Sequence, residues 1–411
     1  MGRRWIWLAA WPVTAVFVLS NAATPLYVLW QRQIGFSRGT LTVVFACYIA
    51  GLIGSLLVSG VLSDRIGRKP VLLPALALGI VACLVFATAT SVAALIAARL
   101  ATGIAVGAAV SAGMAAVTDI AGPERGRLGA LLASCAMVLG AGLGPLLAGI
   151  LSEAAPHPTV TVFAVEALLL VSAVAVVLRL PLGRPAAGPR RGPWIRLPAV
   201  PSGSGRQLAL GVAVFAPGIT ATSFVLSLGP SLLATLLGTT SRVLAGGMAF
   251  VMFLTATAVQ FAVRGRQLRT ILLASALATV PAMLALIVAV RTSSALLLVL
   301  AAVLAGAGQG LGQLGGLSLL AAEVPGTRLA EANAALNVGG YLMAGTLPVA
   351  AGYLSDATGL ATGATVFGVL LAALAAAGGV FVARGGHRRR APAGKAPDAE
   401  PAPAAHSSRS Y

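Results

Sequence analysis

Two long apolar runs, residues 40–62 and 71–89, are joined by the short polar segment Gly60-Val-Leu-Ser-Asp64-Arg65-Ile-Gly67-Arg68-Lys69-Pro70. Each run is long enough to cross the ~30 Å hydrocarbon core of a bilayer as a helix, which takes about 20 residues. Two spanning helices must therefore be joined by these few polar residues. Glycine permits tight backbone turns and proline suits the first turn of a helix, so Gly60, Gly67 and Pro70 fit a short connection.

Apolar runs of spanning length recur along all 411 residues of the chain. Only 9% of the residues are charged, against about 25% in a typical soluble domain, so the composition excludes a water-soluble enzyme. The runs lack the ~10-residue alternation of a membrane β-barrel and predict an all-α integral membrane protein. The twelve expected spans are residues 5–29, 40–62, 71–89, 92–118, 128–152, 160–181, 208–235, 243–263, 270–290, 295–320, 331–354 and 361–383.

The basic residues lie mainly on one side of this topology. Placing the N-terminus in the cytoplasm puts 23 of the 28 Lys and Arg residues in cytoplasmic segments, and leaves four in outer loops and Arg99 within a span. Such a bias sets membrane orientation, so we expect a multi-pass protein of the inner (plasma) membrane with both termini in the cytoplasm. The net charge of +18 then reflects anchoring in the lipid bilayer and does not indicate a nucleic-acid partner.

An internal repeat divides the spans into six and six. Residues 145–153, at the end of the fifth span, match residues 348–356, at the end of the eleventh, with an offset of 203 residues. A duplicated six-helix unit is typical of transporters built from two halves. We expect a first six-helix bundle at 1–182, a cytoplasmic central loop at 183–206, a second bundle at 207–383 and a disordered basic cytoplasmic tail at 384–411.

The polar segment at 60–70 resembles the signature loop of the major facilitator superfamily, Gly-x-x-x-Asp-Arg-x-Gly-Arg-Arg/Lys, at every defining position. It also lies between the second and third spans, as in that family. The resemblance extends over residues 5–383. It implies twelve transmembrane helices in two six-helix bundles, related by a pseudo-two-fold axis around a central cavity.

The resemblance also implies that the loop is a conformational latch. Its motif residues are Gly60, Asp64, Arg65, Gly67, Arg68 and Lys69. In the family, the acid and the arginines hold the cytoplasmic side closed in the outward-facing state, and Asp119 is a candidate partner for Arg65 or Arg68. The second-half counterpart, Arg264-Gly-Arg266-Gln-Leu-Arg269, has no aspartate, so we expect a one-sided latch. A loop that only set orientation would need bases but not Asp64.

Arg99 begins the segment Arg99-Leu-Ala-Thr-Gly103 in the fourth span and is the one basic residue well inside a helix. An arginine in hydrocarbon costs at least about 2.5–3.5 kcal/mol, so its side chain must face a cavity or a partner, or snorkel to the outer interface. The segment resembles the family's Arg-x-x-x-Gly motif, which is linked there to substrate or proton handling.

The fifth span contains Gly140-Ala-Gly-Leu-Gly144-Pro145-Leu-Leu-Ala148-Gly149. This stretch resembles the antiporter motif Gly-x-x-x-Gly-Pro-x-x-Gly-Gly, which is found mainly in exporters of the family, with Ala148 in place of one glycine. Pro145 removes a backbone donor and the glycines allow close packing of helices. Ordinary packing of small residues is the alternative interpretation.

Uncharged polar residues inside the spans are candidate substrate contacts. In the family, the first, fourth, seventh and tenth spans surround the cavity, which favours Asn21, Gln309 and Gln313 for the substrate pathway. Each is equally compatible with an interhelical hydrogen bond. Glu166 in the sixth span is the one carboxylate well inside a span, and because burial disfavours a charged carboxylate, it is a candidate proton carrier. Cys47, Cys83 and Cys135 are expected to pack in the interior.

These features predict a monomeric secondary transporter without cofactor, metal site or catalytic residues. We expect proton-coupled export of small amphipathic molecules by alternating access, with neutral or anionic substrates preferred because Arg99 is the expected fixed charge of the cavity. The alternatives are an importer of a sugar, carboxylate or other small metabolite, and a membrane sensor that uses the fold without transport. The sequence contains no GxxxxGK[ST] nucleotide-binding loop.

Overall fold

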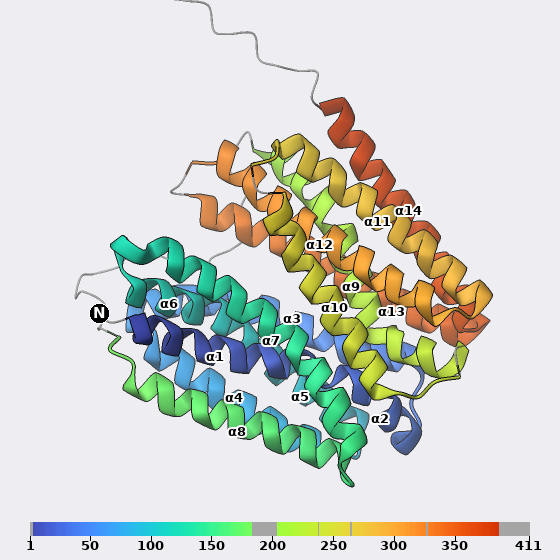
Figure 1. Cartoon of the computed structure of the whole chain (residues 1–411), viewed down its shortest axis with the longest axis horizontal. Helices are drawn as coiled ribbons and strands as arrows, with labels where there is room; N and C mark the ends of the chain where they lie inside the picture. Colours follow the sequence, from blue (N-terminus) through green and yellow to red (C-terminus); the bar gives the residue numbers. More distant parts are fainter. Residues whose placement is uncertain (1–2, 183–203, 237, 264, 326–327, 386–411) are drawn as a thin grey trace, which may run out of the picture.

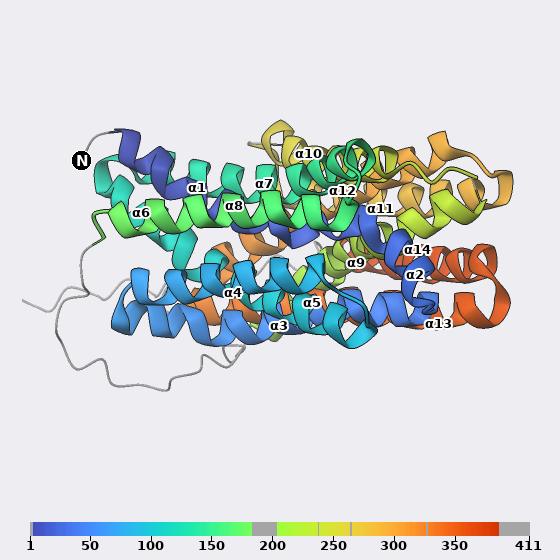
Figure 2. The same cartoon turned by 90° about the horizontal axis from the view of Figure 1, so that it is seen from below.

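The computed structural model describes residues 3–182, 204–236, 238–263, 265–325 and 328–385, and these residues form helices joined by short connections (Figures 1 and 2). The first half contains α1 (Arg3–Ala22), α2 (Tyr27–Ile34), α3 (Arg38–Ile66), α4 (Lys69–Ala87), α5 (Val92–Ala108), α6 (Met114–Ala121), α7 (Gly126–Ala154) and α8 (Pro158–Arg179). The second half contains α9 (Gly205–Leu236), α10 (Arg242–Ala262), α11 (Leu268–Thr292), α12 (Ala295–Glu323), α13 (Leu329–Thr358) and α14 (Leu360–Gly385).

Twelve stretches of the described chain are long and apolar enough to cross a membrane, and they coincide with the twelve predicted spans. Two of the spans are not single α-helices. A 3-10 turn at Thr24–Leu26, which contains Pro25, separates α1 from α2, because proline has no backbone N–H to continue the helix. A π-helical turn at Ala109–Gly113 joins α5 to α6. The predicted first span at 5–29 therefore contains a break, and its second helical piece continues to Ile34.

Serine residues define where several helices begin. Ser37 accepts a hydrogen bond from the backbone N–H of Thr40 at the start of α3, and Ser241 accepts one from Leu244 at the start of α10. A helix leaves its first backbone N–H groups without partners, and a serine oxygen satisfies one of them. These caps end the turns that connect consecutive spans.

The helices pack as two six-span bundles with the same internal pattern. In the first half α3 packs on α5, α1 on α7 and α4 on α8, and in the second half α10 packs on α12, α9 on α13 and α11 on α14. The halves meet where α7 packs on α10 and α3 packs on α13. Exchanging the two halves interchanges these two junctions, as a pseudo-two-fold axis requires.

Consecutive spans run in opposite directions, so the connections lie at two ends of the helices. We call the end that carries Arg3 and residues 60–70 the signature end. The end that carries residues 35–37 and 239–241 is the opposite end. The exposed side chains of the outer helix faces include many large apolar residues, such as Leu168 and Leu277, which suits contact with lipid. The predicted boundaries at 183–206 and 384–411 fall almost wholly outside the described residues.

Candidate functional site: a cavity between the two halves

A cavity of about 950 Å³ lies between the halves. Side chains of the first, second, fourth, fifth, seventh, eighth, ninth, tenth and eleventh spans line it. Its lining continues to Val263, Gly265 and Arg266 in the connection between α10 and α11. At the other extreme, no described residue of the connections at the opposite end belongs to the lining. The cavity therefore extends to the signature end and is closed toward the opposite end.

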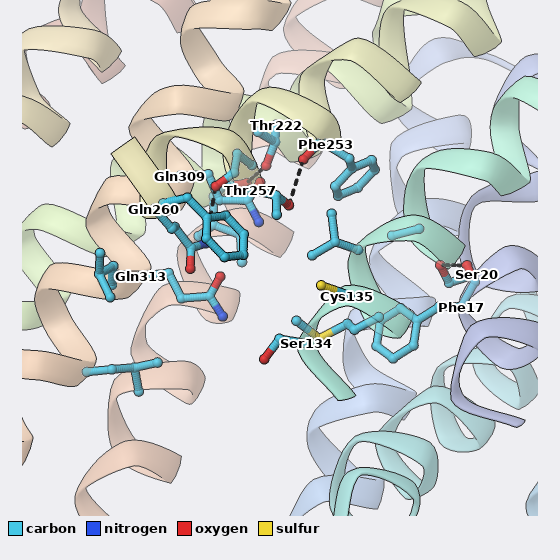
Figure 3. Close-up of a pocket in the computed structure, with 18 of the residues that line it drawn as sticks. Phe17, Ser20, Ser134, Cys135, Thr222, Phe253, Thr257, Gln260, Gln309 and Gln313 are labelled. Atoms are coloured by element: carbon cyan, nitrogen blue, oxygen red, sulfur yellow. Dashed lines mark hydrogen bonds between the residues drawn. The ribbon is translucent and has the colours of Figure 1, made fainter. Parts of the chain in front are cut away.

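One wall of the cavity is rich in amide and hydroxyl groups. Gln260 of α10 and Gln309 and Gln313 of α12 project into it, near Thr222 and Thr257 (Figure 3). The Gln260 amide donates to the carbonyl of Ala256 at 3.1 Å, whereas the buried Oε1 of Gln309 has no hydrogen-bond partner among the described residues. All of these groups belong to the second half.

The facing wall, from the first half, is more apolar. Figure 3 shows Phe17, Ser134 and Cys135 across the cavity from the glutamines. Phe45 and Tyr48 of α3 also line it. Within the described part of the lining, Arg266 is the one charged residue, and no carboxylate or lysine lines the cavity. Such a cavity suits an uncharged molecule with one polar and one apolar side.

Arg99 lies directly behind this wall and is fully buried, so it does not snorkel. Its Nη1 donates to the carbonyl oxygen of Ser20 at 2.8 Å. Its guanidinium carbon lies 5.0 Å from the ring centroid of Tyr48, 5.1 Å from that of Phe45 and 5.6 Å from that of Tyr27. Nε and Nη2 have no hydrogen-bond partner in the described chain. Aromatic faces therefore supply much of the stabilisation of this buried charge.

The glycines that follow Arg99 bring α5 against α3. A Cβ atom on Gly103 would come 2.9 Å from the backbone nitrogen of Leu52, and one on Gly107 would come 2.8 Å from the carbonyl oxygen of the same residue. The absence of side chains lets the two backbones approach, as in other small-residue helix contacts. This contact positions Tyr48 and Phe45 over Arg99.

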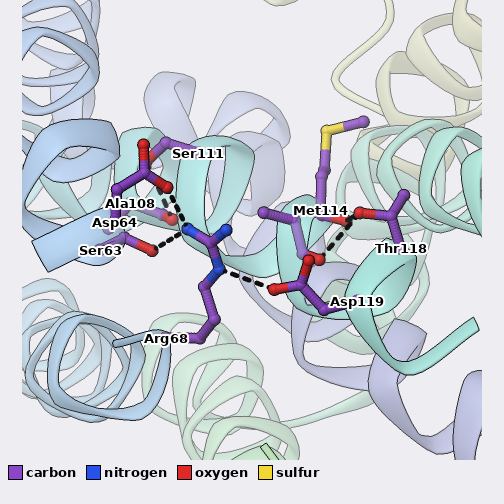
Figure 4. A network of polar contacts seen from close by, with 9 residues as sticks. Ser63, Asp64, Arg68, Ala108, Ser111, Met114, Thr118 and Asp119 are labelled. Carbon is purple, nitrogen blue, oxygen red and sulfur yellow. Dashed lines mark hydrogen bonds and ion pairs between the residues drawn. The ribbon is translucent and has the colours of Figure 1, made fainter. Parts of the chain in front are cut away.

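The signature loop forms a polar network within the first half (Figure 4). Arg68 donates to Asp64 at 2.8 Å, to the Ser63 hydroxyl at 2.7 Å and to Asp119 at 2.9 Å. One guanidinium thus joins the end of α3 to the end of α6. Burial lowers the pKa of Arg68, but hydrogen bonds and charges from Asp119 and Asp64 raise it, and the net shift is upward. Arg68 is therefore a permanent cation at physiological pH.

Among the described residues, the second-half counterpart of this loop repeats one contact of the signature loop. Lys69 donates to the carbonyl of Leu178 at the end of α8, at 2.8 Å. Arg269, at the equivalent place, donates to the carbonyl of Ala383 near the end of α14, at 2.9 Å. Gln267 is the residue before α11. In the first half, the corresponding region holds the acidic network of Asp64 and Asp119. Arg264 lies outside the described residues.

The fifth-span motif lies where the first span and the second half meet α7. A Cβ on Gly144 would collide with the backbone of Val18 in α1, and one on Gly140 would collide with Thr14 and Phe17. Gly149 and Pro145 face α10: a Cβ on Gly149 would come 3.0 Å from the carbonyl carbon of Arg242. The motif thus sets the spacing of a junction between the halves.

The remaining predicted residues have separate environments. Asn21 lines the cavity, and its amide donates to the Ser20 hydroxyl at 3.1 Å. Glu166 is buried in the first-half bundle, does not line the cavity, and its Oε2 has no partner in the described structure. The structure thus brings Asn21, Gln309 and Gln313 together and leaves Glu166 apart.

Several residues that line the cavity were not predicted from the sequence. Gln260 and Thr257 were detectable, because they are uncharged polar residues inside the eighth apolar run. Cys135 was expected to be an interior packing residue, but it lines the cavity. Its neighbours along the helix are mostly apolar, so the sequence did not separate it from a packing residue.

Comparison with known proteins bears on what this architecture does. The family model described as Major Facilitator Superfamily matches residues 6–268. The Multidrug resistance protein MdtL of Escherichia coli (strain K12 / DH10B) is 34% identical over 83 residues, which are 18% of this chain and 21% of the relative. The same protein from Shigella boydii serotype 18 (strain CDC 3083-94 / BS512) matches equally. The matched region thus spans about a fifth of these relatives.

Solved structures show the same fold at low sequence identity. The nucleoside transporter NupG superposes with a TM-score of 0.72 at 14% identity, covering 92% of this chain and 99% of that chain. A bacterial homolog of the human lysosomal transporter Spinster, in an inward-facing and occupied conformation, gives 0.73 at 14% identity, covering 93% and 97%. A POT family transporter in complex with 5-aminolevulinic acid gives 0.73 at 11%, covering 92% and 95%.

Proposed function

Because the chain belongs to the Major Facilitator Superfamily, and is therefore a membrane transporter rather than an enzyme, we propose that it exports small neutral or anionic amphipathic molecules in exchange for protons. Transport proceeds by alternating access, in which the two halves rock about the cavity. The observation that carries the proposal is the cavity itself, with amide groups on one wall, apolar side chains on the other and no described carboxylate.

The lining supports the substrate class. Glutamine amides both donate and accept hydrogen bonds, and Gln260, Gln309 and Gln313 bring three of them to one wall of the cavity. A lipophilic cation would require a counter-charge once it is desolvated, and the described lining offers only Arg266, which carries the wrong sign. Neutral compounds therefore fit best, and anions can be drawn by Arg266 and by Arg99 behind the wall.

The orientation follows from the distribution of basic residues. The signature end carries the Arg- and Lys-rich connections, which the positive-inside rule assigns to the cytoplasm. With this assignment the cavity faces the cytoplasm and the opposite end faces outward. The network of Asp64, Arg68 and Asp119 then lies on the cytoplasmic side, where we propose that its residues, with Arg65, re-pair across the halves when that side closes.

Two observations support export, and a third supports proton coupling. The fifth-span motif packs at a junction between the halves, and the 83-residue match is to proteins named for multidrug resistance. Glu166 is the candidate proton carrier, because it is a buried carboxylate inside a span with an unpartnered oxygen. Its position away from the cavity separates the proton site from the substrate site.

The proposal is tested in inverted membrane vesicles with an imposed proton gradient. We expect gradient-driven accumulation of a neutral amphipathic compound and little accumulation of a cationic compound of matched size. Glu166→Gln should abolish the gradient dependence, whereas Glu331→Gln, which changes an exposed carboxylate paired with Arg328, should not. Accumulation of the cation alone would reject the substrate class. Substrate movement in the other direction would identify an importer, and no movement of any compound would favour a sensor.

A further inference from the structure

The opposite end of the molecule is closed by two hydrogen-bonded junctions that follow the internal repeat. Glu153, in the last turn of α7, accepts hydrogen bonds from the backbone N–H groups of Arg242 and Val243 at the start of α10, the second at 3.1 Å. Asp356, near the end of α13, accepts from the backbone N–H groups of Arg38 at 2.9 Å and Gly39 at 2.8 Å, at the start of α3.

Both junctions cross from one half to the other. Glu153 belongs to the first half and caps a helix of the second, whereas Asp356 belongs to the second half and caps a helix of the first. The two acids are separated by the same 203 residues that relate the repeats. In each case one carboxylate satisfies two of the N–H groups that a helix start leaves without partners, and it also faces the positive end of the helix dipole.

The packing around each cap is also repeated. A Cβ on Gly149 would collide with the backbone of Arg242, and a Cβ on Gly352 would come 3.0 Å from the carbonyl oxygen of Arg38. Each glycine lies four residues before the acid of its junction. The close approach that these glycines allow places the carboxylates within reach of the partner helices.

These contacts must break in each transport cycle. The cavity extends to the signature end and is closed at the opposite end, so access from the opposite side requires α7 to separate from α10 and α3 from α13. Four backbone N–H groups and two carboxylates then exchange their partners for water. Both carboxylates are already partly solvent-exposed, so this exchange is inexpensive and reversible, as a cycling gate requires.

We propose that Glu153 and Asp356 are the positioning residues of an outer gate, and that together they set the balance between the conformation seen here and one open at the opposite end. They do not touch the cavity and do not bind substrate. The gate rests on the proposed transport function only in that alternating access must occur. It does not depend on which substrate is carried.

The test uses two cysteine reporters in the full-length protein in membranes, with Cys47 and Cys83 replaced by serine. Cys135 reports the cavity as seen from the signature end. Ser231→Cys reports the opposite end, because Ser231 is buried there and its hydroxyl lies 3.2 Å from Oε1 of Gln31 across the junction of α2 and α9. Each reporter is labelled with a maleimide without added substrate, so a wrong substrate class leaves the result interpretable.

The variants are Glu153→Gln, Asp356→Asn and both together, with Glu331→Gln as the matched control. An amide keeps an acceptor oxygen but loses the charge, so we expect each single change to lower the labelling rate of Cys135 and to raise that of Ser231→Cys, by about threefold. The double variant should show about tenfold. Unchanged rates at both reporters in the double variant would overturn the gate. Higher rates at both reporters would also overturn it, because the acids would then serve only to hold the fold together.

Discussion

The two halves share a helix arrangement but differ in their polar chemistry. The first half holds the buried cation Arg99, the buried carboxylate Glu166 and the network around Arg68. The second half presents uncharged amides, Gln260, Gln309 and Gln313, to the same cavity. At the opposite end the halves are again alike, because each supplies one carboxylate that caps a helix of the other.

This comparison shows which side chains both halves of the duplicated fold need and which side chains can differ between the halves. The junctions between the halves are made by equivalent helices, so both copies need small residues and a cap there. Side chains at the cavity and at the signature end have different roles in the two halves, so they have diverged. If charge in the first half and amides in the second half have separate roles, substitutions in the two halves should have different effects on transport.

Arg99→Ala should cause the largest loss, with transport reduced at least tenfold. The substitution empties the space between the Ser20 carbonyl and three aromatic rings, and it removes the fixed positive charge behind the cavity wall. Arg99→Lys should recover only part of the activity, since an ammonium group does not stack on rings as a guanidinium does. Transport rates in proteoliposomes check this. A rate for Arg99→Ala within twofold of the wild type would contradict it.

Asp64→Asn and Asp119→Asn should each reduce transport by about three- to tenfold, because each removes a charge-assisted hydrogen bond to the half-buried Arg68. The matched change in the second half is Glu323→Gln, at the end of α12, which should leave transport unchanged. Initial rates at saturating substrate measure the effect. Equal losses in all three variants would show that the signature end is symmetric after all.

Gln309→Leu and Gln313→Leu should weaken apparent substrate affinity by about two- to fivefold, which corresponds to losing a neutral hydrogen bond of roughly 0.5–1 kcal/mol. Cys135→Ala, on the facing wall, should change affinity by less. The KM for transport distinguishes these outcomes, with the maximal rate expected to stay close to that of the wild type. A larger effect at Cys135 than at the glutamines would reverse the assignment of the polar wall.

Lys69→Gln and Arg269→Gln should have the smallest effects, and these should be equal. Each cation donates to a carbonyl near the end of the last helix of its half, at 2.8 and 2.9 Å, and such exposed contacts contribute less than about 1 kcal/mol. We expect a slight decrease in the melting temperature of the purified protein and unchanged transport. A loss of transport in Lys69→Gln alone would instead support the latch role that the signature motif implies for this lysine.

Much of the fold followed from the sequence because its determinants are local. Apolar run length predicted each span, and the serines at 37, 91, 241 and 294 mark where helices begin. The break at Pro25 in the first span was not predicted, because the apolar run continues through it. The π-helical turn at Ala109–Gly113 had no comparable signal, because its residues suit an ordinary helix equally well.

The site was only partly predictable. Asn21, Gln309 and Gln313 stood out as polar residues in spans expected to face the cavity, and they line it. The surroundings of Arg99 could not be predicted, since Ser20, Tyr27, Phe45 and Tyr48 come from other helices. In the sequence, Glu166 was as good a candidate for the substrate or proton pathway as Asn21. Only the packing of the helices shows that Glu166 lies away from the cavity.

The sequence by itself determined that this chain spans a membrane twelve times, in two related halves, with a signature loop between the second and third spans. Hydrocarbon tolerates no unpaired backbone and few charges, so composition and run length leave little choice of structure. Only the tertiary structure decided which end of the cavity is closed and what closes it. Glu153 and Asp356 are ordinary helix-end acids in the sequence, and their role depends on backbone N–H groups that lie 89 and about 318 residues away along the chain.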